Sequence, residues 1–564
     1  MSPQWNPNEP TFHLGINMAG AVSAGAYTAG VLDFLTEALD QWYAAKASAA
    51  SPVPRHDVSI DIFSGASAGG MCAAISAVML QGPFQHIHNP ADATVQNTTN
   101  RFYESWVNKI DIEPLLGAAD LQGGGPVVSL FDSTIIDTIA DYALTPLPAP
   151  KPPDYVSTSL NLILTLTNVR GVPFSLNGTA PGSVEEDMAY YADRLQFETV
   201  QGTNNPLFPA AKPLPLGSNS GAWPLLKDAA KATGAFPLFL APRTITRKAG
   251  DYYSSPWNPI ATPPTSAVPP HWSLQSSSDF PTLNVDGGVT DNDPFELAHD
   301  FLAVHNPLAV RDPNTGELQN PSAADKANCA VVTVAPFPAQ NLFNPNYNFA
   351  ANSSIFGMLP NLFTVLVSQS RFQGETLEAV VSGTSYSRFV LAPSDTGNPN
   401  LSALQCGLLG AFGGFFERGF RAHDYQLGRR NCQKFLRDSF RLALTNPIID
   451  KGLGKLSTAD RVKAITAFDP AHLNTLPIIP LYGSAVPEVT APPRATIASA
   501  RVNQIIDMVV ERLHGVAKPL LESAIGDGVR DAVVRAGVDT LISTWGKGKI
   551  ASYLQEQLRD VTAG

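Results

Sequence analysis

Residues 59–70 read Ser-Ile-Asp-Ile-Phe-Ser-Gly-Ala-Ser-Ala-Gly-Gly, and Met-Cys-Ala-Ala-Ile follows at 71–75. This stretch predicts a short apolar strand that runs through Gly65-Ala-Ser67-Ala-Gly69 into a helix of small residues. A nucleophile elbow has this layout, with Ser67 at its tip, and its sharp turn leaves no room for neighbouring Cβ atoms. The helix would aim its positive N-terminus at the reacting centre. The same pentapeptide also occurs in ordinary strand-loop-helix turns, so its partners must be sought elsewhere in the chain.

The composition predicts a globular α/β protein and excludes several classes of partner. The 564 residues are 44% apolar but only 15% charged, and 48 prolines indicate long, well-populated loops. A net charge of -12 without any run of Lys or Arg argues against a nucleic-acid partner and against attraction to anionic lipid.

The N-terminal sequence, the hydropathy and the cysteines also restrict the expected location of the protein. Residues 1–10 have neither the basic nor the apolar region of a cleavable signal peptide, and no stretch of 18 apolar residues predicts a membrane span. The four cysteines lack Cys-x-x-Cys spacing, which favours free buried thiols in a reducing compartment over a disulfide frame or a zinc site. We therefore expect a cytoplasmic or peripheral membrane protein.

The order of elements around the elbow indicates an α/β core. A strand at 11–18, a small-residue loop at 19–25 and a helix at 26–39 precede it. Residues 161–176 predict two strands of the core sheet, or of its edge, joined by a turn at 168–171. Further on, the pattern predicts a helix at 295–305 and an apolar strand at 330–336, so the core extends beyond residue 300.

The domain boundaries follow from proline and from helical periodicity. Three Pro-rich tracts, at 146–153, 204–216 and 256–270, are expected as surface loops that rim or cover a cleft. We expect a catalytic domain at 10–305, an extension of its core at 306–484 and a helical region at 485–564. In that region the apolar residues that recur with helical spacing are Val502, Ile505, Ile506, Val509, Val510 and Leu513. Packing on the catalytic domain is the favoured interpretation of this stripe, and contact with a lipid surface is the alternative.

A serine nucleophile needs a base and an anion site, and two distant segments provide candidates. At 282–294 a strand delivers Asp286 into a Gly-Gly turn, although a turn or capping aspartate would give the same pattern. The small-residue loop at 20–25 can present successive backbone N–H groups before a helix, and the N–H of Ala68 adds another beside Ser67.

Four blocks, taken in order, resemble those of the patatin-like phospholipase family. Residues 20–32, Gly-Ala-Val-Ser-Ala-Gly-Ala-Tyr-Thr-Ala-Gly-Val-Leu, are similar to the family's Gly-Gly-Gly-x-Arg-Gly-Ala-Tyr-x-x-Gly-Val-Leu. The elbow at 65–69 comes second, and residues 232–242 are similar to the family's Ala-Ser-x-Ala-x-Pro run. Residues 286–294 carry Asp-Gly-Gly-Val-x-x-Asn-x-Pro. The joint order is specific, and it covers the chain from about residue 10 to 305.

The resemblance implies a three-layer patatin-like fold, with a central mainly parallel sheet between helices, to which the C-terminal helical segment is added. It implies a lipid acyl hydrolase, of phospholipase A or lysophospholipase type, in which Ser67 is the nucleophile and Asp286 the base. The reaction passes through an acyl-serine and requires no metal or organic cofactor. The partners implied are a lipid or acyl-ester substrate and, peripherally, a membrane. The implied oxyanion donors are Gly20, Ala21, Val22 and Ala68, and the motif glycines are Gly25, Gly65, Gly69, Gly287 and Gly288.

The chain departs from the family pattern in the oxyanion block. Ala21 and Val22 stand in place of glycines, and Ala24 stands in place of the usual arginine. Backbone N–H donors survive such replacements where φ is negative. The departures leave open a catalytically inactive lipid-binding protein that kept the fold.

Other polar residues suggest an alternative catalytic mechanism, and two further polar groups are best explained by structural roles. A Ser-His-Asp esterase of the α/β-hydrolase type would need a late histidine, for which His299 and His423 are the candidates. His86 and His88 alternate like metal ligands but lack a nearby carboxylate cluster in the sequence, which favours loop residues. The polar run at 421–432 is expected to be structural, as in a buried ion-pair network.

Overall fold

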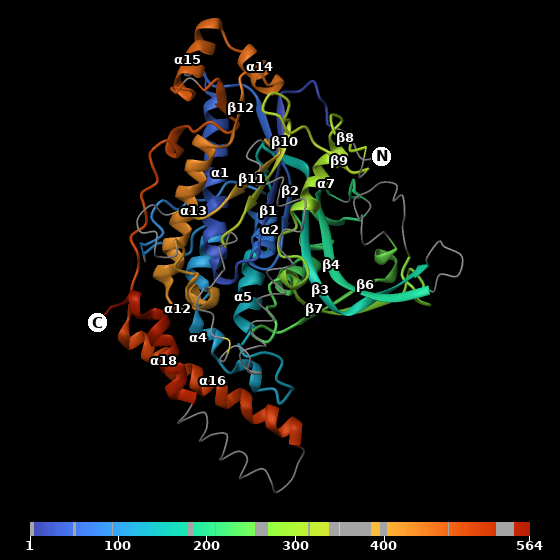
Figure 1. Cartoon of the computed structure of the whole chain (residues 1–564), viewed down its shortest axis with the longest axis vertical. Helices are drawn as coiled ribbons and strands as arrows, with labels where there is room; N and C mark the ends of the chain where they lie inside the picture. The colour runs from blue at the N-terminus through green and yellow to red at the C-terminus, as the bar shows by residue number, and fades with distance from the viewer. Residues whose placement is uncertain are drawn as a thin grey trace.

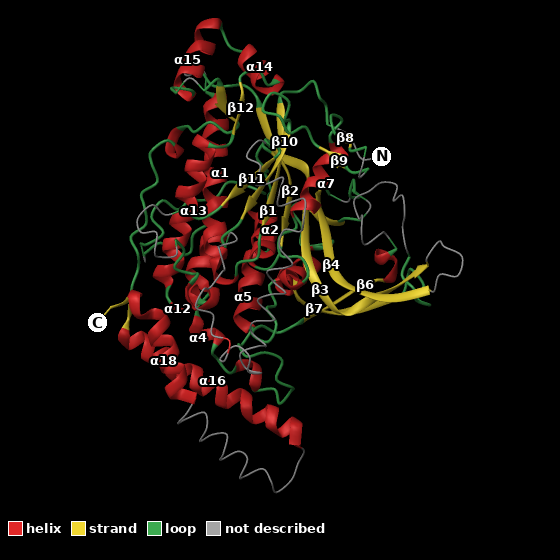
Figure 2. Ribbon diagram, viewed as in Figure 1, coloured by secondary structure: helices red, strands yellow, loops and turns green. Residues whose placement is uncertain are grey.

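The computed structural model describes residues 5–48, 52–92, 94–177, 185–202, 204–208, 210–253, 269–313, 316–337, 349, 385–394, 403–471, 473–525 and 546–563. A nine-stranded sheet forms its centre, and helices flank both faces (Figure 1; Figure 2). Mainly parallel strands between two helical layers, with further helices at the C-terminus, confirm the predicted fold class.

The order along the sheet is β11-β10-β1-β2-β3-β4-β5, and β7 and β6 continue from β3. The five strands from β11 to β3 run parallel, whereas β4 and β7 both run antiparallel to β3. The bounds of these strands are β1 Thr11–Met18, β2 Asp57–Gly65, β3 Val156–Asn177, β4 Glu185–Val200, β5 Lys212–Pro215, β6 Arg243–Lys248, β7 Asp279–Asp286, β10 Cys329–Val334 and β11 Arg388–Leu391.

Two apolar cores hold the three layers together. On one face the alternate side chains of β1, including Phe12 and Leu14, pack in the largest buried cluster. The helices of that face are α1 (Gly25–Ala47), α2 (Ala68–Met79), α6 (Trp223–Thr233) and α13 (Arg418–Asp438). On the other face Ile62 and Ile163 pack against α7 (Phe295–His305). α1 continues eight residues beyond the predicted 26–39, because Trp42 is fully buried and its neighbours favour helix.

The remaining elements are short. The helices and helical turns are η1 Val22–Ala24, α3 Arg101–Tyr103, η2 Glu104–Lys109, α4 Ile112–Leu115, η3 Ala119–Leu121, α5 Thr134–Ala143, η4 Ala249–Tyr252, η5 Gly287–Val289, α11 Leu408–Ala411, α12 Gly413–Phe416, α14 Pro447–Gly454, α15 Thr458–Phe468, η6 Gly483–Ala485 and η8 Arg559–Val561. Three two-stranded sheets pair β8 (Val310–Arg311) with β9 (Leu318–Gln319), β12 (Arg441–Ala443) with β13 (Thr475–Pro477), and β14 (Ile497–Ala498) with β15 (Thr562–Ala563).

The predicted turn at 168–171 is wrong. β3 is one strand of 22 residues, and its register with β4 shifts between Thr167 and Val172. Gly171 at φ 73° provides the conformation of a bulge, not of a hairpin. The Asn-Val-Arg-Gly pattern therefore marks a bend within a long strand whose true hairpin partner is β4.

The prediction that the Pro-rich tracts are loops is confirmed for one tract and wrong for part of another. Residues 146–153 are irregular, as predicted, but Lys212–Pro215 forms β5. β5 lies at the end of the sheet, where prolines are tolerated because one side of an edge strand needs no backbone donor. Most of the tract at 256–270 lies outside the described residues.

The C-terminal region contributes helices α16 (Ser499–Ile525) and α18 (Lys547–Leu558), which lie side by side at one end of the molecule in Figure 1. Val502, Ile505 and Ile506 are buried with Leu554 and Leu558 in a further apolar cluster, in agreement with packing rather than lipid exposure. Within the described part of the chain, no helix is long and apolar enough to cross a membrane. The division into three domains stays a prediction.

Candidate active site

The sheet brings Ser67 and Asp286 together along a single edge of β3. One edge of β3 pairs with β4 from Asn161 onward, apart from the bulge after Thr167, and Leu166 lies opposite Asp193 there. The other edge pairs with β2 as far as Leu164, opposite Gly65, and then with β7 from Leu166, opposite Asp286. β2 and β7 therefore end facing each other, and the residues that follow them meet.

The turn after β2 has the geometry of a nucleophile elbow. Ser67 has φ 52° and ψ -128°, a strained conformation for a residue with a side chain. A Cβ on Gly65 would lie 2.6 Å from the backbone of Gly69, and a Cβ on Gly69 would overlap the carbonyl of Met18. Helix α2 begins at Ala68, directly after the serine. Both motif glycines are therefore required by close backbone approach.

Ser67 and Asp286 form a buried hydrogen-bonded pair. The Ser67 hydroxyl donates to Asp286 Oδ2 at 2.6 Å, and the backbone N–H of Gly288 donates to Oδ1 at 2.7 Å. Their exposed fractions are only 7% and 3%. Burial raises the pKa of Asp286 to about 7, against the lowering effect of the hydrogen bonds from Ser67 and Gly288. The carboxyl thus has the proton affinity of a base that works near neutral pH.

The two glycines after Asp286 are fixed by close contacts as well. A Cβ on Gly287 would overlap the carbonyl of Thr165, and one on Gly288 would overlap the side chain of Asn292. The Asn292 side chain also lies against Gly20, whose N–H donates to the Asn292 carbonyl at 3.1 Å. The turn after β7 and the loop after β1 are therefore packed together beside Ser67.

The oxyanion candidates divide into two groups. The N–H of Gly20 is already bonded, whereas those of Ala21, Val22 and Ala68 have no acceptor among the described residues. Ala21 keeps a negative φ of -151°, but Val22 has φ 48°. The condition of a negative φ is therefore met at Ala21 but not at Val22, which takes the left-handed backbone conformation usually left to glycine.

The loop that carries these donors is held from its far side. Ser23 donates to the Ala411 carbonyl at 2.6 Å and accepts from the N–H of Gly414 at 3.0 Å. Gly25 lies under Trp106, whose ring atoms would meet an added Cβ at 2.4–2.6 Å. These contacts fix the conformation of the loop although Ala21, Val22 and Ala24 replace two glycines and the arginine of the family pattern.

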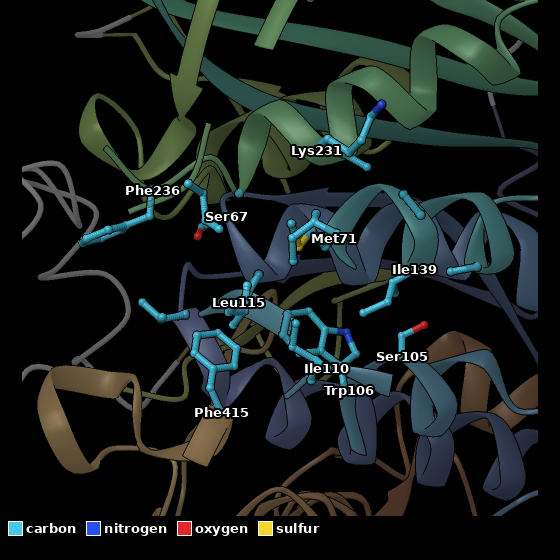
Figure 3. Close-up of a pocket in the computed structure, with 18 of the residues that line it drawn as sticks. Ser67, Met71, Ser105, Trp106, Ile110, Leu115, Ile139, Lys231, Phe236 and Phe415 are labelled. Atoms are coloured by element: carbon cyan, nitrogen blue, oxygen red, sulfur yellow. The ribbon is translucent and has the colours of Figure 1, made fainter. Parts of the chain in front are cut away.

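An apolar pocket opens beside Ser67 (Figure 3). The view places Ser67 at one side of the pocket and Ser105 at the other, with Met71, Trp106 and Ile139 between them. The lining residues are Val22, Ser67, Ala68, Met71, Ile75, Ser105, Trp106, Ile110, Leu115, Phe131, Ile136, Ile139, Ala140, Ala143, Leu144, Ala230, Lys231, Gly234, Phe236, Leu240, Phe412 and Phe415. Nearly all are apolar, so the pocket suits a hydrocarbon chain.

The histidine candidates have other partners. His423 bonds to Asp424 at 2.8 Å, and His299 lies 3.4 Å from Asp300. In the part of the chain that the structure describes, Ser67 and Asp286 have no histidine among their hydrogen-bond partners.

The run at 421–432 contributes to a buried ion-pair network, as expected. Arg429 bonds at 2.5 Å to Glu37 Oε2 and to Asp33, both fully buried on α1. Asp33 and Asp40 also bind His86. Burial lowers the pKa of His86, but the hydrogen bonds and charges of these carboxylates outweigh that effect and raise the pKa to about 9. His86 therefore lies next to carboxylates that are distant from it in the sequence.

Thr233 is a site residue that the sequence did not single out. Its Oγ1 accepts the N–H of Ser67 at 2.9 Å, while the carbonyl of Ala235 accepts the N–H of Asp286 at 2.9 Å. The block at 232–242 therefore contacts the backbone of both Ser67 and Asp286. Its resemblance to a family motif was the available signal, but the pattern gave no role to the threonine.

Replacing Thr233 with Val is expected to slow ester cleavage about tenfold and to cost about 1–3 kcal/mol of unfolding free energy. The shape is kept, but the buried N–H of Ser67 loses its acceptor and the elbow is less well fixed. Steady-state kinetics and urea unfolding measure the two effects. Thr138→Val, at an exposed position of α5, is the matched control and should change neither. Equal behaviour of the two variants would contradict this role of Thr233.

This protein is of the α/β class, and an elbow serine, a buried carboxyl partner and an adjacent apolar pocket lie together on its mainly parallel sheet. The family model for patatin-like phospholipase matches residues 17–299. The uncharacterised protein y4iI of Sinorhizobium fredii is 32% identical over 592 aligned residues, covering 97% of this chain and 81% of that protein. The chain belongs to the patatin-like phospholipase family.

A search of solved structures matches VipD from Legionella pneumophila, over 100% of this chain and 89% of that one. The sequence identity is 11% and the TM-score 0.21, so this likeness carries no argument about function.

Proposed function

We propose that this protein is a lipid acyl hydrolase, of phospholipase A or lysophospholipase type, that uses a Ser67–Asp286 dyad. The observation that carries the proposal is the 2.6 Å hydrogen bond from Ser67 to a buried carboxyl, beside an apolar pocket. The pocket takes the acyl chain, and its apolar lining favours long chains because each buried methylene contributes about 0.8 kcal/mol.

The reaction is acyl transfer through a covalent intermediate. Ser67 Oγ attacks the ester carbonyl carbon while its proton passes to Asp286 Oδ2. The carbonyl oxygen takes up the electron pair and is stabilised by the N–H groups of Ala21, Val22 and Ala68. Collapse expels the alcohol, which takes the proton from Asp286. A water molecule then attacks the acyl-serine and gives a proton to Asp286. When the acyl–oxygen bond breaks, Asp286 returns this proton to Ser67 Oγ, and the fatty acid leaves.

Peripheral contact with a lipid surface is part of the proposal. The segment at 128–131 and the segment at 236–240 pair through the N–H of Leu130 and the carbonyl of Leu238 at 2.7 Å. Both segments contribute pocket-lining residues, and their Val128 and Leu238 are 53% and 76% exposed. Apolar side chains at these positions can enter a lipid layer while a substrate transfers to the pocket.

The rival Ser-His-Asp mechanism is disfavoured because, among the described residues, neither His299 nor His423 is a hydrogen-bond partner of Ser67, whose hydroxyl donates to Asp286 instead. The direct test incubates the protein with a panel of phospholipids, lysophospholipids and simple acyl esters and identifies the products by mass spectrometry. Release of fatty acid by the wild-type protein and by His299→Ala and His423→Ala, but not by Ser67→Ala, is expected. Absence of any released acid would support the lipid-binding alternative.

The activity should depend on the ionisation of Asp286. Only the carboxylate can accept the serine proton, so kcat/KM is expected to rise with pH, reach half its maximum near pH 7 and stay level above it. Initial rates on a soluble ester from about pH 5 to pH 9 measure the profile. The rate of fluorophosphonate labelling should follow the same curve. A flat profile in a protein that stays folded would contradict Asp286 as the base.

A further inference from the structure

The buried guanidinium of Arg512, on α16, joins the C-terminal region to two loop segments of the catalytic core. Its Nε donates to the carbonyl of Leu130 at 2.8 Å, and its two terminal nitrogens reach Gly117, Asp120 and Ser129 at 2.6–3.3 Å. The ion pair with Asp120 is bidentate, and Arg512 is only 4% exposed. One side chain thus satisfies three backbone carbonyls and one carboxylate.

The segments that Arg512 holds form one wall of the pocket. Leu115 and Phe131 line the pocket and stand two residues before Gly117 and one residue after Leu130. The backbone of this wall continues into the neighbouring segment, because Leu130 donates to the carbonyl of Leu238 and Phe131 donates at 2.9 Å to Phe239. Hydrogen bonds thus connect Arg512 to both of these pocket-lining segments.

A second arginine of the same helix offers a contrast. Arg501, three helical turns before Arg512, pairs with Asp111 at 3.1 Å and with Glu113. Glu113 is 48% exposed and Arg501 22%, so this pair is screened by water and contributes little. Arg512 is buried, and its loss leaves several polar groups without a partner.

We propose that Arg512 is a positioning residue that sets the width of the acyl pocket and so its preference for long chains. It is not among the residues that line the pocket, and it acts through Leu115 and Phe131. The inference rests on the proposed function, since it takes the occupant of the pocket to be an acyl chain. A long chain contacts the whole wall, whereas a short acyl group occupies only the part next to Ser67.

The test compares p-nitrophenyl palmitate with p-nitrophenyl butyrate in the same detergent. Arg512→Ala is expected to lower kcat/KM for palmitate by about tenfold to a hundredfold, mainly through KM, and to leave butyrate within about twofold. Arg501→Ala, the matched control, should leave the ratio of the two esters unchanged. Equal loss on both esters, or no loss on either, would overturn the proposal.

Two further measurements test the proposal if Arg512→Ala does not fold or if the protein cleaves neither ester. If Arg512→Ala does not fold, Asp120→Asn and Arg512→Lys carry the same comparison, since each weakens the contacts without removing all of them. If the wild-type protein cleaves neither ester, the hydrolase proposal fails, and the affinity for a fluorescent long-chain fatty acid then decides the role of Arg512. Weaker binding by Arg512→Ala than by Arg501→Ala supports the proposal, and equal binding overturns it.

Discussion

Replacing Asp286 with Asn is expected to lower kcat for ester hydrolysis by about 10⁴-fold. The amide keeps the shape of the carboxyl and can still contact Ser67 and Gly288, but it cannot accept the serine proton at any accessible pH. The loss should therefore lie in kcat rather than in KM. Steady-state kinetics on a chromogenic ester measure it, and wild-type activity in this variant would contradict the dyad.

The same substitution should stabilise the protein. The folded-state pKa of Asp286, about 7, lies above its ordinary value of 3.8, so the folded protein holds a proton that the unfolded chain releases between these values. The wild-type protein therefore loses stability as the pH rises through this window. Above pH 7 Asp286→Asn escapes the loss and should be more stable by on the order of a few kcal/mol. A gain in unfolding free energy together with the loss of activity separates a missing base from a misfolded site.

Replacing Arg429 with Met is expected to lower the unfolding free energy by about 3–5 kcal/mol, because it leaves Asp33 and Glu37 as buried charges without a cation. Burial alone would raise the pKa of Asp33, but Arg429 and the hydrogen bonds from His86 and Ile87 hold it below its ordinary value. Such a carboxylate stabilises the fold above its unfolded pKa and loses that contribution as the pH falls. The destabilisation by Arg429→Met should therefore be largest at neutral pH and shrink in acid.

The neighbouring Arg430 provides the control. It pairs with Glu488, which is 68% exposed, and Arg430→Met should change the unfolding free energy by less than about 0.5 kcal/mol. Urea unfolding of the two variants at several pH values makes the comparison. Equal effects of the two substitutions would show that the buried network does not stabilise the contact between α1 and α13.

The local parts of the fold and of the site could be predicted because their patterns are short and specific. The elbow around Ser67 needs two glycines for backbone contact, and β1 and α7 have clear periodicity that gives their bounds. Asp286 follows a predicted strand and precedes two glycines, so its position at the end of β7 could be predicted from the sequence.

The long-range parts could not be predicted, since they depend on which strands become neighbours. The bulge at Gly171 resembles a hairpin turn in sequence, and only the pairing with β4 distinguishes them. The bond from Ser67 to Thr233 spans 166 residues, and those of Arg512 to the loop at 117–130 span more than 380. The periodicity of apolar residues in the sequence does not predict such long-range contacts. Val22 shows a further limit, because a β-branched residue gives no sequence signal for a positive φ.

The central claim, that Ser67 is a nucleophile activated without histidine, is tested most directly by covalent labelling. The protein is incubated with a fluorophosphonate, digested, and analysed by mass spectrometry for the peptide that contains residue 67. We predict a single adduct on Ser67 in the wild-type protein, in His299→Ala and in His423→Ala, much slower labelling in Asp286→Asn, and none in Ser67→Ala. No adduct on wild-type Ser67, or a label that survives in Ser67→Ala, would contradict the account.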